Sequence, residues 1–376
     1  MAERGPFRYH LLDAASRLLP PVQSREGGLV VFSPGHMGDI LLTAPMLQQF
    51  RSARPTERVT WLVGPWSLPL ARHYVGFADA VWPLAPDQDI YWRGNPLWRQ
   101  SLSTQWRMAR RLRQQRPATL ISTGLDNAVA RFLANVLEPT CWVLRADHRP
   151  PRIKRRVQTV VQPYDSSRYE ADALAGLLNP LGIPSSPVKQ PVYIVHPEER
   201  REAEDFLLRE GLALDRPLVL LSPGSGWAGK NWPAPRFAAL AGQLERGQHA
   251  QVAWLGGPGE ERLLPAHSAA VRWNWVGRLP IPLLAAVMEQ ATVWVGNDSG
   301  PMHLAAAVGT PTVSIWGPTS PVVWAPRGER HIHFRRGSAC PGCRYWDHRA
   351  ACLLPGHDCI AKVEVGDVAD AVKSLL

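Results

Sequence analysis

No apolar run in the sequence reaches the roughly 18 residues that a membrane-spanning helix needs. The N-terminus also lacks the apolar core and the small-residue cleavage site of a secretory signal. Long biased tracts are absent, and 45% of the 376 residues are hydrophobic, which excludes a disordered chain. We therefore expect a globular cytoplasmic protein, long enough for two domains.

Cysteine is scarce, with five residues in the chain, and reduced thiols are expected in an unexported protein. Four of the five form one group: Cys340, Cys343, Cys352 and Cys359. The first two have the C-x2-C spacing that grips a metal ion from a tight turn, and the later pair could complete a tetrahedral set of thiolates. The gaps after Cys343 are looser than in standard zinc sites. Structural zinc or iron and free or facultatively disulfide-bonded thiols therefore both remain open.

Acidic residues are too few to balance the basic ones: 32 against 42, for a net charge of +10. This balance favours an anionic partner such as nucleic acid, a phosphorylated glycolipid or a membrane surface. No zinc-finger, basic-zipper or RNA-recognition signature is present, so nucleic acid is not expected. The basic residues bunch at 107–116, 145–156 and 327–336, where the alternative is an ordinary solvated face.

An amphipathic stretch near the N-terminus carries apolar residues from Phe7 to Leu19 with arginines between them. Such a helix either lies on anionic lipid or packs on its own domain. Both interpretations stay open.

The rest of the chain repeats an apolar strand, a glycine turn and an amphipathic helix, which predicts parallel sheets covered by helices, an α/β fold. Four prolines within 180–191 predict a linker at 181–191, between domains at 1–180 and 192–376. We expect a ligand cleft between the carboxyl ends of the two sheets. The predicted strands are 29–32, 59–63, 80–83, 118–122, 141–144, 218–222, 252–256, 293–296 and 312–316, and the predicted helices are 39–51, 97–115, 126–137, 167–179, 234–245, 282–290 and 301–308.

The loop after the first strand, 33–39, offers a carboxylate, Asp39, at the start of a helix. It contains neither a Walker sequence nor a dinucleotide fingerprint. The plain alternative is an acidic helix cap, typically worth about 0.3 to 1 kcal/mol.

The loop 222–233 combines three glycines with Lys230, a composition that suits phosphate binding, although an ordinary strand-to-helix connection would look similar.

In the segment 295–309, Ser299 or Gly300 is the predicted helix N-cap, Pro301 the first helical residue and Gly309 the end of the helix. A helix N-terminus in this place suits a diphosphate, with Asp298 and His303 as the polar groups nearest to it. After the strand at 252–256, Glu260 or Glu261 could accept hydrogen bonds from ribose hydroxyls, unless the pair is only solvated.

Together these motifs resemble those of the bacterial heptosyltransferases of glycosyltransferase family 9, which build the inner core of lipopolysaccharide. The matching pieces are residues 35–45, 224–233 and 297–307, with 317–321 as a fourth, and the likeness spans about residues 28–322 in order and spacing. The resemblance implies a GT-B fold, with two Rossmann-like domains facing each other across a cleft. It also implies an ADP-sugar donor, which we expect to be ADP-heptose, an anionic glycolipid acceptor and inversion at the anomeric carbon without a cofactor or catalytic metal.

The resemblance also implies roles for single residues. Asp39 would be the general base that takes the acceptor proton, and Lys230 would neutralise the departing diphosphate. The first domain would bind the acceptor at the cytoplasmic face of the inner membrane, and the second would bind the nucleotide sugar. The implied donor-binding set is Gly38, Ser225, Gly226, Glu260, Glu261, Asp298, Ser299, Gly300, Met302 and His303.

Two features depart from the family pattern. Residues 1–27 precede its usual start, and Asp87-Gln-Asp89 resembles the metal-binding Asp-x-Asp of another class of glycosyltransferases, which we treat as chance. Alternatives to heptosyl transfer are a relative with another nucleotide sugar or a protein or small-molecule acceptor, and a sugar-nucleotide binding protein without catalysis.

Overall fold

The chain divides into two compact units, Met1–Val188 (unit 1) and Lys189–Leu376 (unit 2). The division lies inside the segment 181–191 in which the sequence predicts a linker. The computed structural model describes residues 15–16, 18–24, 26–84, 102–125, 128–145, 153–154, 156–248, 250–264, 271–335 and 359–376. The predicted Asp-x-Asp pattern, Asp87 to Asp89, lies outside this part of the chain.

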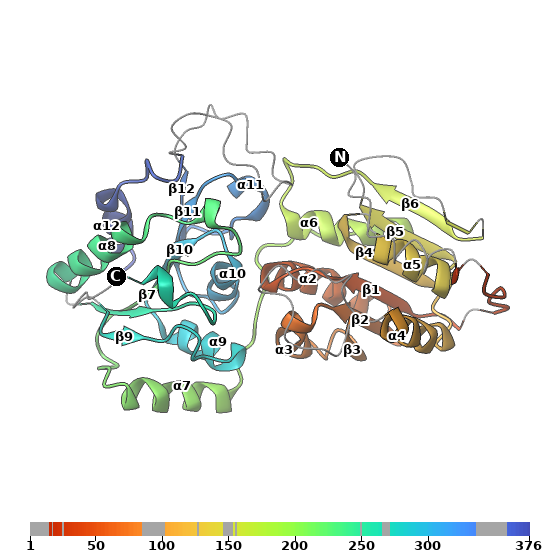
Figure 1. The fold of residues 1–376 in the computed structure, drawn as a ribbon, viewed down its shortest axis with the longest axis horizontal. Coiled ribbons are helices and arrows are strands. Elements are labelled where there is room, and N and C mark those ends of the chain that lie inside the picture. The colour runs from red at the N-terminus through yellow and green to blue at the C-terminus, as the bar shows by residue number, and fades with distance from the viewer. Residues whose placement is uncertain are drawn as a thin grey trace. The chain divides into compact units, whose positions relative to one another are not determined.

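Unit 1 contains a six-stranded parallel sheet with the spatial order β3-β2-β1-β4-β5-β6 (Figure 1). This is the strand order of a Rossmann fold, in which the chain builds one half of the sheet outward and then returns to build the other. The elements are β1 (Leu29–Ser33), α2 (Met37–Ala53), β2 (Val59–Val63), α3 (Leu68–Arg72), β3 (Ala80–Pro83), α4 (Leu102–Gln114), β4 (Thr119–Leu125), α5 (Ala128–Leu137), β5 (Cys141–Arg145), β6 (Gln158–Gln162) and α6 (Glu170–Ala175), with short 3-10 helices at Pro65–Ser67 and Gly176–Leu181.

Unit 2 repeats the same plan with the order β12-β11-β10-β7-β8-β9, again with parallel pairing (Figure 1). Helices α8 and α12 pack on each other, and α9 packs on α7 and α10. The elements are α7 (Pro197–Arg209), β7 (Leu218–Ser222), α8 (Ala234–Gln248), β8 (Gln251–Trp254), β9 (Trp273–Asn274), α9 (Ile281–Gln290), β10 (Val293–Asn297), α10 (Gly300–Ala307), β11 (Thr312–Trp316), α11 (Pro321–Trp324), β12 (His331–Arg335) and α12 (Val365–Lys373), with 3-10 helices at Ala228–Lys230 and Glu261–Leu263.

The central strands are the continuous apolar runs that the sequence shows. Every residue of β1, β2, β7, β10 and β11 is buried, as expected for strands covered on both faces. Serines within these strands satisfy buried indole groups: Trp61 Nε1 donates to Ser33 Oγ at 3.0 Å, and Trp316 Nε1 donates to Ser314 Oγ at 2.8 Å. A polar residue in an apolar strand thus has a packing role here.

Several predicted boundaries were wrong. Helix α2 begins at Met37 and not at Asp39, so Asp39 is its third residue, and the predicted helix at 167–179 is a short α6 followed by a 3-10 turn. Ser299 is the N-cap of α10, which makes Pro301 its second residue, and Gly309 ends the helix with a φ of +90°.

None of the described helices is long and apolar enough to cross a membrane.

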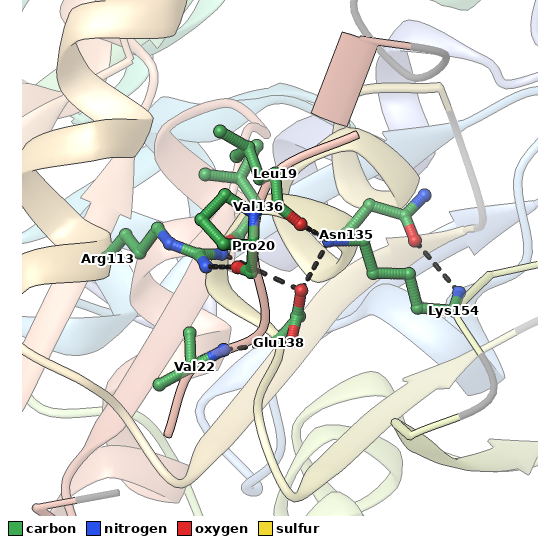
Figure 2. A network of polar contacts seen from close by, with 8 residues as sticks. All are labelled: Leu19, Pro20, Val22, Arg113, Asn135, Val136, Glu138 and Lys154. Atoms are coloured by element: carbon green, nitrogen blue, oxygen red, sulfur yellow. Dashed lines mark hydrogen bonds and ion pairs between the residues drawn. The ribbon is translucent and has the colours of Figure 1, made fainter. Parts of the chain in front are cut away.

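The described part of the N-terminal segment packs on unit 1, and Leu19 contacts its hydrophobic core. A network of polar contacts centred on Glu138, whose side chain is 2% exposed, holds this segment against the rest of unit 1. Figure 2 shows Glu138 between Lys154, which forms an ion pair with it, and the Val22 backbone N–H, which donates to Oε2 at 3.2 Å. For residues 18–24, packing on the own domain is therefore the better interpretation than lipid binding.

Arg113 completes this network, which we call the Glu138 clasp. Its guanidinium lies 3.8 Å from Glu138 and donates to the carbonyl oxygens of Pro20 and Val136 (Figure 2). Lys154 and Arg113 belong to two of the basic runs that could have served an anionic partner. Part of the chain's positive charge is therefore used inside the fold.

Candidate functional site

In unit 2 the strands β7, β8 and β9 are added toward one edge of the sheet, and β10, β11 and β12 are then added toward the other edge. The order therefore reverses between β7 and β10, which are hydrogen-bonded neighbours. Ligands of open parallel sheets bind at this topological switch point, beyond the carboxyl ends of the strands. The loops that leave β7 and β10 carry Lys230 and Asp298, and the structure brings the two together: Lys230 Nζ lies 2.9 Å from Asp298 Oδ2. Their side chains are 18% and 8% exposed, so the pair is screened from water but still reaches the surface.

His303 lies one turn into α10, is buried, and interacts electrostatically with both members of this pair. Burial lowers the pKa of His303 to about 4, with the nearby Asp298 acting to raise it and Lys230 to lower it further. The imidazole is therefore neutral at physiological pH, so one ring nitrogen can donate a hydrogen bond and the other can accept one.

Two hydroxyl groups at the same edge of the sheet are buried without a hydrogen-bond partner in the described part of the chain: Ser299 Oγ and Thr319 Oγ1. Ser299 occupies the N-cap position of α10 without a capping hydrogen bond from its side chain, and Thr319 follows β11, the neighbour of β10. Buried hydroxyls normally have partners, so two without one at this edge of the sheet are unusual and mark the loops here as candidates for a polar function. Ser299 was among the predicted donor-site residues, whereas Thr319 was not, although it lies in the motif 317–321.

The loops at this edge are held by Asn297, which the sequence analysis also missed as a functional residue. Its Oδ1 accepts the Trp232 backbone N–H and its Nδ2 donates to the Pro223 carbonyl, both at 2.8 Å. Asn297 thus fixes both ends of the loop that carries Lys230. Ser225 acts within that loop, since its Oγ lies 2.5 Å from Asn231 Oδ1 and 2.7 Å from the Trp227 carbonyl oxygen.

The structure distinguishes the two glutamates after β8. Glu260 turns toward the loop after β7: a Cβ atom added to Gly224 would lie 2.3 Å from Glu260 Oε1. The Gly257 N–H donates to Glu260 Oε2 at 2.8 Å, and burial raises the pKa of the Glu260 carboxyl. Glu261 is exposed. Of the two, Glu260 is the one that belongs to the loops of the switch point.

The other predicted donor-site residues fall on the same loops. Gly300 is the first residue of α10 and Met302 is buried in its first turn, whereas Gly226 is exposed in the loop after β7. Gly38 belongs to unit 1, where it is buried in the first turn of α2.

Unit 1 has its switch point between β1 and β4, and Asp39 lies just beyond β1. Its Oδ2 accepts the His36 backbone N–H at 2.7 Å, so the carboxylate does cap the helix, as the plain interpretation requires. A carboxylate has about four acceptor sites, however, so the bond from His36 does not by itself prevent Asp39 from taking a proton. A Cβ atom on Gly35 would lie 2.4 Å from Asp39 Oδ2, so only glycine there admits the carboxylate in this position.

The predicted metal group cannot be traced, because Cys340, Cys343 and Cys352 lie outside the described residues. Cys359 is described and half-buried. No cluster of three metal-ligating side chains occurs among the described residues.

Two Rossmann-like units, one with a basic and polar switch point and one with a carboxylate there, match the architecture of glycosyltransferases of the GT-B fold. Residues 106–352 match glycosyltransferase family 9 (heptosyltransferase), and the chain belongs to this family.

Its relatives are consistent with this assignment. The chain is 26% identical over 322 residues to lipooligosaccharide heptosyltransferase 2 of Haemophilus influenzae, covering 80% of this chain and 86% of the relative. It is 25% identical over 316 residues to lipopolysaccharide heptosyltransferase 2 of Salmonella typhimurium, covering 78% and 83%.

Solved structures show the same fold. A family 9 glycosyltransferase from Veillonella parvula superposes with a TM-score of 0.76 at 20% identity, covering 95% of this chain and 99% of the other. For ADP-heptose LPS heptosyltransferase II of E. coli the TM-score is 0.67 at 18% identity, with 93% and 98% covered. TibC, a dodecameric iron-containing heptosyltransferase of E. coli solved with ADP-D-beta-D-heptose, gives 0.56 at 15% identity, with 94% and 77% covered. These likenesses confirm the predicted GT-B fold class.

Proposed function

We propose that the protein transfers a heptose from ADP-heptose to a hydroxyl group of a lipopolysaccharide core acceptor, with inversion at the anomeric carbon. The observation that carries the proposal is the group formed by Lys230, Asp298 and His303 with the orphan Ser299 hydroxyl, at the switch point of unit 2. The curated relatives are lipopolysaccharide and lipooligosaccharide heptosyltransferases, which supports the choice of sugar and acceptor.

The nucleotide diphosphate suits the chemistry of unit 2. The N-terminus of α10 offers backbone N–H groups and the positive end of its dipole to a phosphate. Lys230 adds a full positive charge, and Asp298 holds it in place until the ligand arrives. Glu260 would accept the ribose hydroxyls, with its carboxylate held by the Gly257 N–H.

The reaction is a single displacement. The acceptor oxygen attacks the anomeric carbon as the bond from that carbon to the β-phosphate oxygen breaks, and ADP leaves with the bonding electrons. Asp39 takes the proton of the acceptor hydroxyl, and Lys230 stabilises the charge that develops on the diphosphate. In this proposal unit 1 binds the acceptor and unit 2 binds the nucleotide sugar, and neither step requires a metal ion.

The acceptor would be an anionic glycolipid, in keeping with the net charge of +10. A lipid-borne acceptor implies work at the cytoplasmic face of the inner membrane, in peripheral association with it. Nucleic acid is not proposed as a partner.

A structural metal remains part of the proposal for Cys340, Cys343, Cys352 and Cys359, with iron favoured over zinc by the iron content of TibC. The ion would stabilise the fold and take no part in the transfer. Elemental analysis of protein purified without added metal should find about one ion per chain, and only trace amounts of zinc and iron would contradict this.

The donor is tested by incubating purified protein with ADP-heptose, ADP-glucose, UDP-glucose and GDP-mannose. The acceptors are de-O-acylated lipopolysaccharides truncated at successive core sugars. Transfer from ADP-heptose at the highest rate supports the proposal. Preference for another nucleotide sugar would favour the alternative of a relative with a different donor, and ADP binding without any transfer would favour a non-catalytic binding protein.

A further inference from the structure

The loop that carries Asp39 is accompanied by two aromatic rings, His36 and Trp66. Trp66 belongs to the 3-10 helix after β2, the strand next to β1, so both rings lie at the carboxyl edge of the unit 1 sheet. Their ring centroids are 6.4 Å apart with an interplanar angle of 41°. His36 is exposed and Trp66 is half-buried, so the pair reaches the surface of unit 1.

Trp66 is held in its position by a hydrogen bond. Its indole N–H donates to the Gly35 carbonyl at 2.9 Å, and the hydroxyl of the next residue, Ser67, donates to the same carbonyl at 3.2 Å. A Cβ atom on Gly64 would lie 2.3 Å from the indole ring, so glycine at that position leaves the space that the ring fills. An immobilised ring loses little conformational entropy when a ligand binds to it.

Gly35 connects this ring to the proposed base. The Trp66 indole is hydrogen-bonded to the Gly35 carbonyl, and the Asp39 carboxylate lies directly against the Gly35 Cα, where any Cβ atom would collide with it. An aromatic surface and a carboxylate thus contact one residue. A molecule whose hydroxyl group reaches Asp39 would have its neighbouring atoms within reach of the indole.

We propose that Trp66, with His36 beside it, forms a stacking subsite for the acceptor sugar whose hydroxyl group is deprotonated by Asp39. The apolar C–H face of a pyranose ring packs on an aromatic face, while its hydroxyl groups stay at the rim to make hydrogen bonds. The subsite therefore selects an acceptor that is a saccharide, and it orients that saccharide toward the base. This inference rests on the proposed function, because it takes Asp39 as the place where the acceptor reacts.

A purely structural role for Trp66 makes a different prediction, so two variants separate the roles. Trp66→Phe keeps an aromatic face but loses the N–H that binds Gly35, whereas Trp66→Leu loses both. Stacking predicts that Trp66→Phe stays within about threefold of the wild type and that Trp66→Leu raises the acceptor KM about tenfold, with the KM of ADP-heptose unchanged. If Trp66 instead only holds the loop through its hydrogen bond to Gly35, both variants should lose activity to the same extent, and the loss should be mainly in kcat.

The experiment measures acceptor and donor KM values with the truncated core oligosaccharides, and their binding to the protein without donor. Trp82→Leu is the matched control, since Trp82 is a half-buried tryptophan of unit 1 that stacks under Arg111 at 4.8 Å. A wild type that transfers heptose while Trp66→Leu keeps its acceptor KM would overturn the inference alone. If the wild type neither binds nor glycosylates any of the oligosaccharides, the inference and the proposed function are both overturned.

Discussion

At the scale of single residues, Lys230 forms an ion pair with Asp298 at the switch point of unit 2. An acidic residue would by itself repel a diphosphate. Any favourable effect of Asp298 on diphosphate binding must then come from its positioning of Lys230, so the two side chains act as one unit. Their effects on ligand binding should not be additive.

We predict that Lys230→Ala and Asp298→Ala each weaken ADP binding, and that the double variant loses less than the sum of the two losses in binding free energy. Isothermal titration calorimetry on the three proteins gives the coupling directly. Wild-type ADP affinity in both single variants would show that the nucleotide binds elsewhere.

Gly224 provides a test of the placement of Glu260. Alanine at this position would bring its Cβ atom to 2.3 Å from the Glu260 carboxylate and displace it, so ADP affinity should fall about tenfold or more. Gly257→Ala is the matched control: its Cβ atom would lie 3.9 Å from Glu260, an ordinary contact, and the backbone N–H is retained. Equal affinities in the two variants would argue against a role for Glu260 in binding the nucleotide.

The candidate residues could be found from the sequence because motifs keep chemically distinctive residues close together. Asp39, Lys230, Asp298 and His303 all stand out beside glycines at strand ends. The roles of Asn297 and Gly224 depend on contacts with residues far away in the chain, such as the Pro223 carbonyl for Asn297 and the Glu260 carboxylate for Gly224. A single sequence does not contain that information in readable form.

At the scale of elements, the sequence predicted the central strands well and missed β6, β9 and β12. All three belong to the outer part of a sheet, and β6 and β12 are half-exposed with polar residues among apolar ones. Such strands have no continuous apolar run by which to recognise them. Helix α7 was missed for a related reason, since only Ala203, Phe206 and Leu207 of its thirteen residues are buried.

The Glu138 clasp also belongs to this scale, because it fastens the N-terminal segment to α4 and α5. Glu138 adopts a left-handed backbone conformation, with a φ of 45°, directly after α5. This conformation is unfavourable for a residue with a side chain. The carboxylate, paired with Lys154, compensates for that cost.

We predict that Glu138→Gln lowers the free energy of unfolding by about 3 to 5 kcal/mol, because two cations would lose their buried counter-charge. Urea denaturation followed by circular dichroism measures the loss. Glu26→Gln is the control: Glu26 pairs with Arg116 at the surface, with side chains 63% and 48% exposed, and should change stability by less than about 1 kcal/mol. Similar losses in the two variants would mean that the clasp contributes no more than a surface pair.

At the scale of the whole molecule, two units of the same strand order carry different chemistry at equivalent points. Unit 1 presents a carboxylate after its first strand, and unit 2 presents a lysine and a helix N-terminus. Three histidines of the described chain have lowered pKa values, the buried His303 and the half-buried His331 and His333, and all belong to unit 2. Unit 2 should therefore dominate the response of the apoprotein to mild acid.

His303 determines the direction in which stability changes with pH. Burial lowers its pKa to about 4, below the ordinary 6.5, so the unfolded chain binds more protons between these values. Its contribution to stability is complete above pH 6.5 and is lost as the pH falls toward 4, by roughly 1 to 3 kcal/mol in all. Glu260 acts in the opposite sense, because its pKa is raised.

We therefore predict that the unfolding midpoint of His303→Gln depends less on pH between 7 and 5 than that of the wild type. Thermal unfolding of both apoproteins at several pH values measures the difference. Parallel curves would mean that His303 is not buried as a neutral ring in solution.

The central claim is that Asp39 is a base and more than a helix cap. Asp39→Asn keeps an oxygen that can accept the His36 N–H, so the cap and the fold should survive. General base catalysis is typically worth about 10² to 10⁴ in rate, which is the loss expected in kcat. The most direct test is therefore to measure kcat for heptosyl transfer and the Kd of ADP on the same preparation of Asp39→Asn. We expect kcat to fall by that factor at unchanged ADP affinity, whereas a variant that keeps most of its turnover would show that Asp39 is only a helix cap.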